Sequence, residues 1–133
     1  MKIKQTLKVL PAWLLTGITV AAVLWLTLSP APLGDEQIEL FPGADKVVHA
    51  LMFGFLTFTI LVDMARGRDF RKIGKSSILL SALGSTLLGI AIEYLQRYME
   101  LGRSFDTADM LADAIGSFTV AGIWLLAEMS RKT

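Results

Sequence analysis

Four apolar stretches, separated by polar segments, dominate the pattern of this chain. Each is fifteen to twenty residues long, and they cover residues 9–28, 47–62, 78–92 and 110–126. Roughly 20 helical residues cross the hydrocarbon core of a bilayer, which is about 30 Å thick. The pattern therefore predicts an all-α fold, an integral membrane four-helix bundle in a single domain over residues 1–133, with helices at about 9–28, 46–64, 77–97 and 107–127.

Composition supports a membrane protein. Hydrophobic residues make up 53% of the chain, whereas about 45–50% is usual for a soluble domain. The chain has no cysteine, which excludes disulfides and thiolate chemistry, and its single histidine excludes a multi-histidine metal site within one copy. We expect membrane lipids as partners, and we do not expect this protein to bind nucleic acid.

The first apolar stretch follows Lys2, Lys4 and Lys8, as the apolar part of a secretory signal would. At twenty residues it exceeds the usual 7–15 of a signal, and Pro32 follows its small-residue site, which suits cleavage poorly. We expect a retained membrane helix with Pro11 in its first turn, where a missing N–H costs little.

Basic residues predict the orientation of the bundle. Ten lie before the first stretch, between the second and third, or after the fourth, and three lie on the other side. By the positive-inside rule, both termini are then cytoplasmic.

Polar residues gather at the other, extracytoplasmic end. Helical spacing places them on shared faces, because residues three or four apart lie on one side of a helix. Charge at membrane depth is costly and marks a functional site by default. The candidate pocket contains Asp45, Lys46, His49, Glu93, Gln96, Arg103, Asp106, Asp109 and Asp113.

Two stripes of small residues lead to the acids. On the third helix, serines and Gly89 recur every four residues up to Glu93, and on the fourth Asp113, Ser117 and Ala121 follow the same step. Small residues let helices approach closely in a membrane. We therefore expect Glu93 and Asp113 to point inward.

Some of these residues also have purely structural interpretations. Asp45, Asp106 and Asp109 begin helices, where acids commonly cap the helix or balance its dipole. Glu93 has Arg97 four residues later and is placed for an ordinary ion pair.

His49 and Asp113 lie deeper in the predicted spans. His49 has a candidate partner in Asp45, four residues earlier, or on another helix. Asp113 has no basic residue three or four positions away, so it needs a partner from another helix, a bound ion or a proton.

The expected ligand is an anion, because two helix N-termini and Lys46 meet at the pocket. Acids outnumber bases there, so a bare anion would be repelled unless some acids are protonated or a divalent cation bridges them. Oxygen ligands suit Mg²⁺ or Ca²⁺. The candidate metal ligands are Glu93, Asp109 and Asp113, and no cofactor is otherwise required.

In sequence order, the motifs resemble the VanZ-like membrane protein family. They are Asp45-Lys46-x-x-His49 with Phe53, Glu93-x-x-Gln96, and Arg103-x-x-Asp106-x-x-Asp109 with Gly116, preceded by Leu28-Ser29-Pro30. Asp113 departs from the pattern, where Asn is expected. The family is named after a member linked to resistance to teicoplanin, a lipoglycopeptide antibiotic. The resemblance implies a multi-pass protein of the bacterial inner membrane with a cell-envelope role.

Three function classes stay open. We prefer a non-enzymatic protein that binds either an antibiotic target or the headgroup of an envelope lipid, such as a lipid-linked cell-wall precursor. The second is a metal-assisted hydrolase or transferase with His49, Asp45 and Glu93 as candidate catalytic residues. The third is a proton-coupled transporter with Glu93 and Asp113 as carriers. The sequence does not specify an oligomeric state.

Overall fold

A computed structural model describes residues 2–29, 41–99 and 106–131, and these are helical apart from short connections and caps. Arg103, a candidate pocket residue, lies outside the described residues. The helices are α1 (Lys2–Lys8), α2 (Leu14–Leu28), α3 (Ala44–Gly67), α4 (Lys75–Met99) and α5 (Thr107–Ser130).

Three helices are long and apolar enough to cross a membrane. They are α3, α4 and α5, with 24, 25 and 24 residues. At a rise of 1.5 Å per residue, each is about 36 Å long and exceeds the bilayer core. Large apolar side chains such as Leu51, Phe55, Leu87 and Ile115 are exposed on them. Such faces suit lipid and are rarely left open to water.

The predicted first span differs from the structure. Instead of one helix from residue 9, the chain makes a turn after α1, and α2 begins at Leu14. Pro11 lies in this turn, where its missing N–H and fixed φ work against a continuous helix. Trp13 follows with a left-handed φ of 60°. The remaining 15 residues of α2 span about 22 Å, which is less than the bilayer core.

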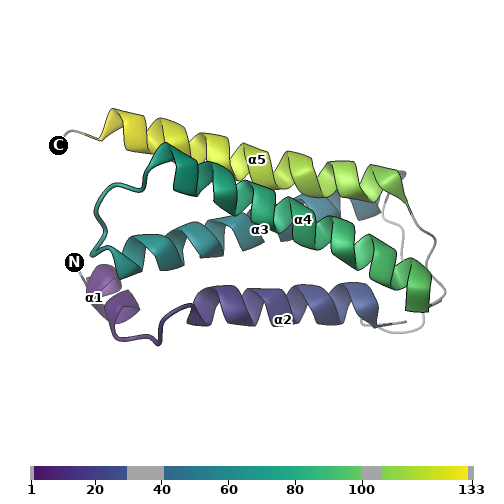
Figure 1. Cartoon of the computed structure of the whole chain (residues 1–133), viewed down its shortest axis with the longest axis horizontal. Coiled ribbons are helices and arrows are strands. Elements are labelled where there is room, and N and C mark those ends of the chain that lie inside the picture. The colour runs from purple at the N-terminus through teal and green to yellow at the C-terminus, as the bar shows by residue number, and fades with distance from the viewer. Residues whose placement is uncertain (1, 30–40, 100–105, 132–133) are drawn as a thin grey trace.

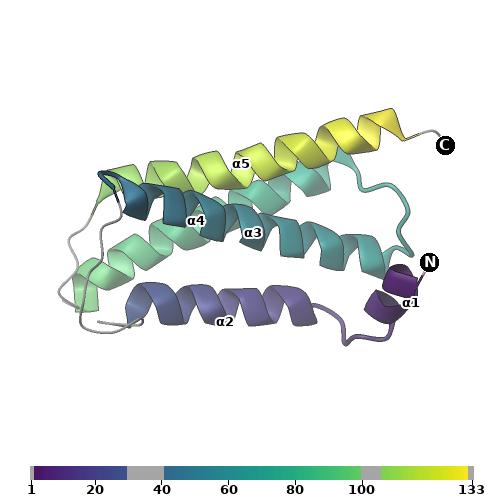
Figure 2. The same cartoon turned by 180° about the vertical axis from the view of Figure 1, so that it is seen from behind.

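The four apolar helices run roughly side by side, and α1 lies at the end where α5 finishes (Figures 1 and 2). The other end, where α3 and α5 begin and α4 finishes, is called the polar end below. α2 packs against α3 and α4 and runs along the side of the molecule away from α5 (Figure 1).

The most extensive helix contact is between α3 and α5, and glycine makes it possible. A Cβ at Gly116 would overlap the backbone of Ala50, and one at Gly54 would lie 3.2 Å from the Gly116 carbonyl oxygen. The two backbones are therefore in direct contact, as at other membrane helix crossings built on small residues.

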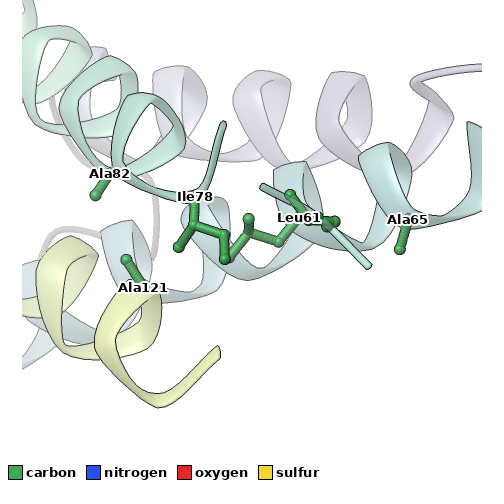
Figure 3. Packing of buried hydrophobic residues seen from close by; sticks show 6 residues of the cluster. Leu61, Ala65, Ile78, Ala82 and Ala121 are labelled. Carbon is green, nitrogen blue, oxygen red and sulfur yellow. The ribbon is translucent and has the colours of Figure 1, made fainter. Parts of the chain in front are cut away.

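Two apolar clusters stabilise the rest of the bundle. Near the end opposite the polar end, Leu61, Ala65, Ile78, Ala82 and Ala121 join α3, α4 and α5 together with Ile73 (Figure 3). A second cluster is made by Val23, Phe53, Leu56 and Ile92, from α2, α3 and α4.

Asp63 ties α2 to α3. One of its carboxylate oxygens accepts hydrogen bonds from the backbone N–H and the hydroxyl of Thr16, each at 2.8 Å. This N–H belongs to the first turn of α2, where donors have no partner within the helix. Arg66 pairs with Asp63 and donates to the carbonyl of Leu7 at 2.7 Å. Asp63, which is buried, thus caps a neighbouring helix.

We predict that Gly116→Ala separates α3 from α5. The added methyl overlaps the Ala50 carbonyl, so the free energy of unfolding should fall by about 1–3 kcal/mol, as for other overpacked sites. The matched control is Gly122→Ala on the same helix, where a Cβ meets nothing within 4 Å. SDS titration in mixed micelles measures both, and equal stability of the two variants would contradict the close contact.

Candidate functional site

Three helices place polar side chains at one depth below the polar end. His49 of α3, Glu93 of α4 and Asp113 of α5 each lie five or six residues from that end of their helix. By helical rise, this is about 8–9 Å. All three are buried, so the polar groups face the inside of the bundle while apolar ones face outward.

His49 and Asp113 form a pair between α3 and α5. The distance from His49 Nδ1 to Asp113 Oδ1 is 2.9 Å, and only 1% of Asp113 is exposed. The ring of Phe53 stacks on the imidazole, with centroids 6.4 Å apart and 13° between planes. His49 is therefore the partner from another helix that Asp113 needs, and the apolar ring of Phe53 packs against the imidazole.

Gly89 makes room for Asp113. A Cβ at Gly89 would overlap Asp113 Oδ2, so the carboxylate lies directly against the backbone of α4. Within the described ranges, this Oδ2 atom has no hydrogen-bond partner. Sequence reasoning placed Gly89 in a small-residue stripe but did not find this role, for which the only signal was its position four residues before Glu93.

Glu93 is equally buried, with 1% of the residue exposed. Its Oε2 atom accepts a hydrogen bond of 3.2 Å from the backbone N–H of Asp106. Its Oε1 atom is buried and has no partner among the residues that the structure describes. A buried polar atom without a partner is costly and calls for an explanation, such as a bound ion.

Lys46 joins three carboxylates at the mouth of the site. Its ammonium bonds to Asp45 at 2.8 Å, to Asp109 at 2.6 Å and to Asp106. Asp106 also caps α5 by accepting from the N–H of Ala108 at 2.9 Å. The Lys46 ammonium, together with this N–H, lowers the pKa of Asp106, so the Asp106 carboxylate is ionised at neutral pH.

Asp109 connects the mouth to the buried pair. Its Oδ1 atom bonds to Lys46, and its Oδ2 atom lies 3.7 Å from His49 Nε2. Potential ligand atoms of His49, Glu93 and Asp109 all lie within 4.8 Å of one another. The structure thus brings these three candidate pocket residues together. Asp113, another predicted ligand, is not in this group.

A second group of acids, Asp45, Asp106 and Asp109, is also close enough to share an ion. Lys46 lies among these carboxylates and bonds to all three. Its ammonium therefore already supplies a cation there, which makes this group the weaker metal candidate.

Two other candidate residues contact groups outside the buried cluster. Gln96 is buried and donates to the carbonyl of Thr27 on α2, so it links helices. Asp45 is not the cap of α3, because Gly43 occupies that position with a φ of 82° and no side-chain cap. Asp45 lies in the first turn, where an acid balances the helix dipole, and it bonds to Lys46.

A hollow of about 460 Å³ lies at the opposite end, lined in part by Trp13, Asp63 and Arg66. Its buried carboxylate, Asp63, is already bonded to Thr16 and Arg66. The polar end, with carboxylate oxygens that lack partners among the described residues, is the better candidate for chemistry.

A bundle that is apolar outside and holds acids and a histidine inside is that of a membrane protein. The VanZ/LLP1 family model matches residues 3–128, nearly the whole chain. The chain therefore belongs to the VanZ/LLP1 family, as the resemblance of its motifs implied. No curated protein and no solved structure matches this chain.

We predict that Gly89→Ala disturbs the His49–Asp113 pair. The methyl takes the space of Asp113 Oδ2, so the carboxylate must turn away from His49 Nδ1. Nitrogen-15 NMR of the histidine ring should report this without ambiguity, because the chain has one histidine. Gly84→Ala is the control, since a Cβ there meets nothing within 4 Å. An unchanged ring spectrum in Gly89→Ala would refute the contact.

Proposed function

We propose that this chain binds the phosphate-bearing headgroup of a cell-envelope lipid at its polar end, from the extracytoplasmic side of the bacterial inner membrane. One observation carries the proposal. A lysine held by three carboxylates lies at the mouth of a buried cluster of acids and a histidine, inside helices whose outer faces suit lipid.

The depth of the cluster supports a lipid as the ligand. The three long helices are about 6 Å longer than the bilayer core, and the buried side chains lie about 8–9 Å from the helix ends. With about 3 Å of helix beyond the core at each end, Lys46 at the mouth lies at the boundary between headgroups and acyl chains, and the buried side chains lie about 5–6 Å below it. A lipid phosphate can reach the mouth without leaving the membrane.

Charge supports an anion that arrives with a cation. The N-termini of α3 and α5 and the Lys46 ammonium favour a phosphate. The negative charges of the Asp45, Asp106 and Asp109 carboxylates repel a phosphate, and all three carboxylates already bond to Lys46. A divalent cation between acids and phosphate removes this repulsion, and we expect it to tighten binding.

A metal-assisted hydrolase is the second candidate, and the His49–Asp113 pair favours it. A carboxylate on Nδ1 orients an imidazole and raises its basicity, as in sites where histidine acts on a substrate. We prefer binding without reaction, because no side-chain nucleophile with an activating neighbour is found among the described residues, which leaves a metal-bound water as the nucleophile of a hydrolase. The family link to glycopeptide resistance fits either candidate, since both act on envelope lipids.

The proposed orientation predicts labelling from outside. The chain has no cysteine, so Thr107→Cys at the polar end and Arg68→Cys at the opposite end provide unique thiols at exposed positions. In intact cells, an impermeant maleimide should modify position 107 and not position 68. The reverse pattern would place the polar end in the cytoplasm and overturn the proposed site of action.

The proposed ligand predicts that Lys46→Gln weakens lipid binding about tenfold or more, because a charged hydrogen bond to phosphate is lost. The measurement is binding of a short-chain polyprenyl phosphate to the chain in phosphatidylcholine nanodiscs, with Mg²⁺, Ca²⁺ or EDTA. Lys75→Gln, at the exposed start of α4, is the charge-matched control.

Three results separate the alternatives. Retained affinity in Lys46→Gln, or equal loss in Lys75→Gln, would refute the headgroup site. Release of inorganic phosphate from the lipid would replace binding by hydrolysis. Binding that EDTA does not weaken would remove the cation bridge and leave the headgroup site intact.

A further inference from the structure

The buried carboxylates below Lys46 carry an inference of their own. Glu93 has one oxygen bonded to the Asp106 N–H and a second, buried oxygen with no partner in the described part of the chain. A carboxylate of Glu93 also lies within 4.8 Å of ligand atoms of His49 and Asp109. A glutamate that lies close to a histidine and another acid, and has a buried oxygen with no partner among the described residues, is what a metal ion would satisfy.

From this geometry, we infer that His49 Nε2, Glu93 and Asp109 hold one divalent transition-metal ion of the Zn²⁺ class. Each ligand comes from a different helix, so the ion would fasten α3, α4 and α5 together at the polar end. The inference does not depend on a headgroup, since the ion is bound by the protein alone.

The distances suit such an ion. Four-coordinate Zn²⁺, with bonds of about 2.0–2.2 Å, has its ligand atoms about 3.4 Å apart. His49 Nε2 and Asp109 Oδ2 are 3.7 Å apart. The remaining adjustment is within the reach of side-chain rotation. Three protein ligands leave a fourth position for water or a substrate oxygen, as in catalytic zinc sites.

Asp113 acts as a positioning residue for the histidine. Its Oδ1 atom, 2.9 Å from His49 Nδ1, accepts a hydrogen bond from the N–H of that nitrogen, so that the lone pair of Nε2 is free for the metal. Metal-binding histidines commonly have a carboxylate on the other nitrogen. This places Asp113 behind the ligand, whereas sequence reasoning had proposed it as a ligand itself.

The types and charges of the ligands favour one kind of ion. Imidazole suits Zn²⁺ and its neighbours, whereas Mg²⁺ and Ca²⁺ take oxygen ligands and water. A divalent ion adds two positive charges beside Glu93, Asp109 and Asp113, where Lys46 already pairs with Asp45 and Asp106 as well as with Asp109. Without that ion, five carboxylates share the site with one lysine.

The test measures metal uptake by the whole chain, without a histidine tag, in phosphatidylcholine nanodiscs after EDTA treatment. Calorimetry and elemental analysis with ZnCl₂ should give one Zn²⁺ per chain, and excess Mg²⁺ or Ca²⁺ should not displace it. Zn²⁺ should also shift the nitrogen-15 signal of Nε2 in the single histidine.

Four variants locate the ion. His49→Ala and Glu93→Gln should weaken Zn²⁺ binding at least a hundredfold, and Asp113→Asn about 10–100-fold, as for other residues that orient a ligand. Asp69→Asn is the control, because Asp69 is exposed and pairs with Lys8 at the opposite end of the bundle. Its affinity should change less than threefold.

A folding defect is distinguished by thermal unfolding. Glu93→Gln removes an unpaired buried charge, so its Tm without metal should equal or exceed that of the parent chain, whereas the rise in Tm on adding Zn²⁺ should vanish. No Zn²⁺ uptake by the folded parent chain would overturn the inference. So would uptake that survives Glu93→Gln, or displacement of Zn²⁺ by equal Mg²⁺ or Ca²⁺.

Discussion

The contact between the backbones of α3 and α5 is the constraint on which the rest of the molecule depends. Gly116 allows it, since any side chain there would overlap Ala50. His49 lies one residue before Ala50, and Asp113 lies three residues before Gly116. Because the helices touch at this point, the two side chains face each other, with 2.9 Å between His49 Nδ1 and Asp113 Oδ1. A wider crossing would leave both polar groups buried and unpaired, at a cost that lipid cannot offset.

The bundle reverses the usual arrangement of a soluble protein. Its outer faces are apolar, while its interior near the polar end holds Glu93, Asp113 and His49. The hydrophobic effect does little to hold helices together in lipid, so packing of small residues and interhelical polar contacts must do so. The same acids that join the helices also have carboxylate oxygens with no partner among the residues that the structure describes. Stability and candidate chemistry therefore rest on one set of side chains.

The lengths of the apolar stretches were enough to predict the three long helices, and helical period was enough to predict that Glu93 and Asp113 point inward. Helical period shows which side of a helix a side chain is on, but it does not show which residue of another helix lies opposite. The pairing of Asp113 with His49 and the role of Gly89 therefore required the structure. The break before α2 was missed because Pro11 is tolerated in a first helical turn, and only the left-handed Trp13 shows that the helix starts later. Gln96 was placed in the pocket by spacing, yet its amide bonds to Thr27.

The hydrogen bonds at the two ends of α2 have a consequence for how the protein is assembled. At 15 residues, α2 is shorter than the bilayer is thick, and its ends bond to side chains that enter the membrane later, Asp63 at Thr16 and Gln96 at Thr27. Because Asp63 and Gln96 follow α2 in the chain, the two bonds cannot form until α3 and α4, respectively, have been synthesised. A chain interrupted before α4 would lack the Gln96 bond at the end of α2.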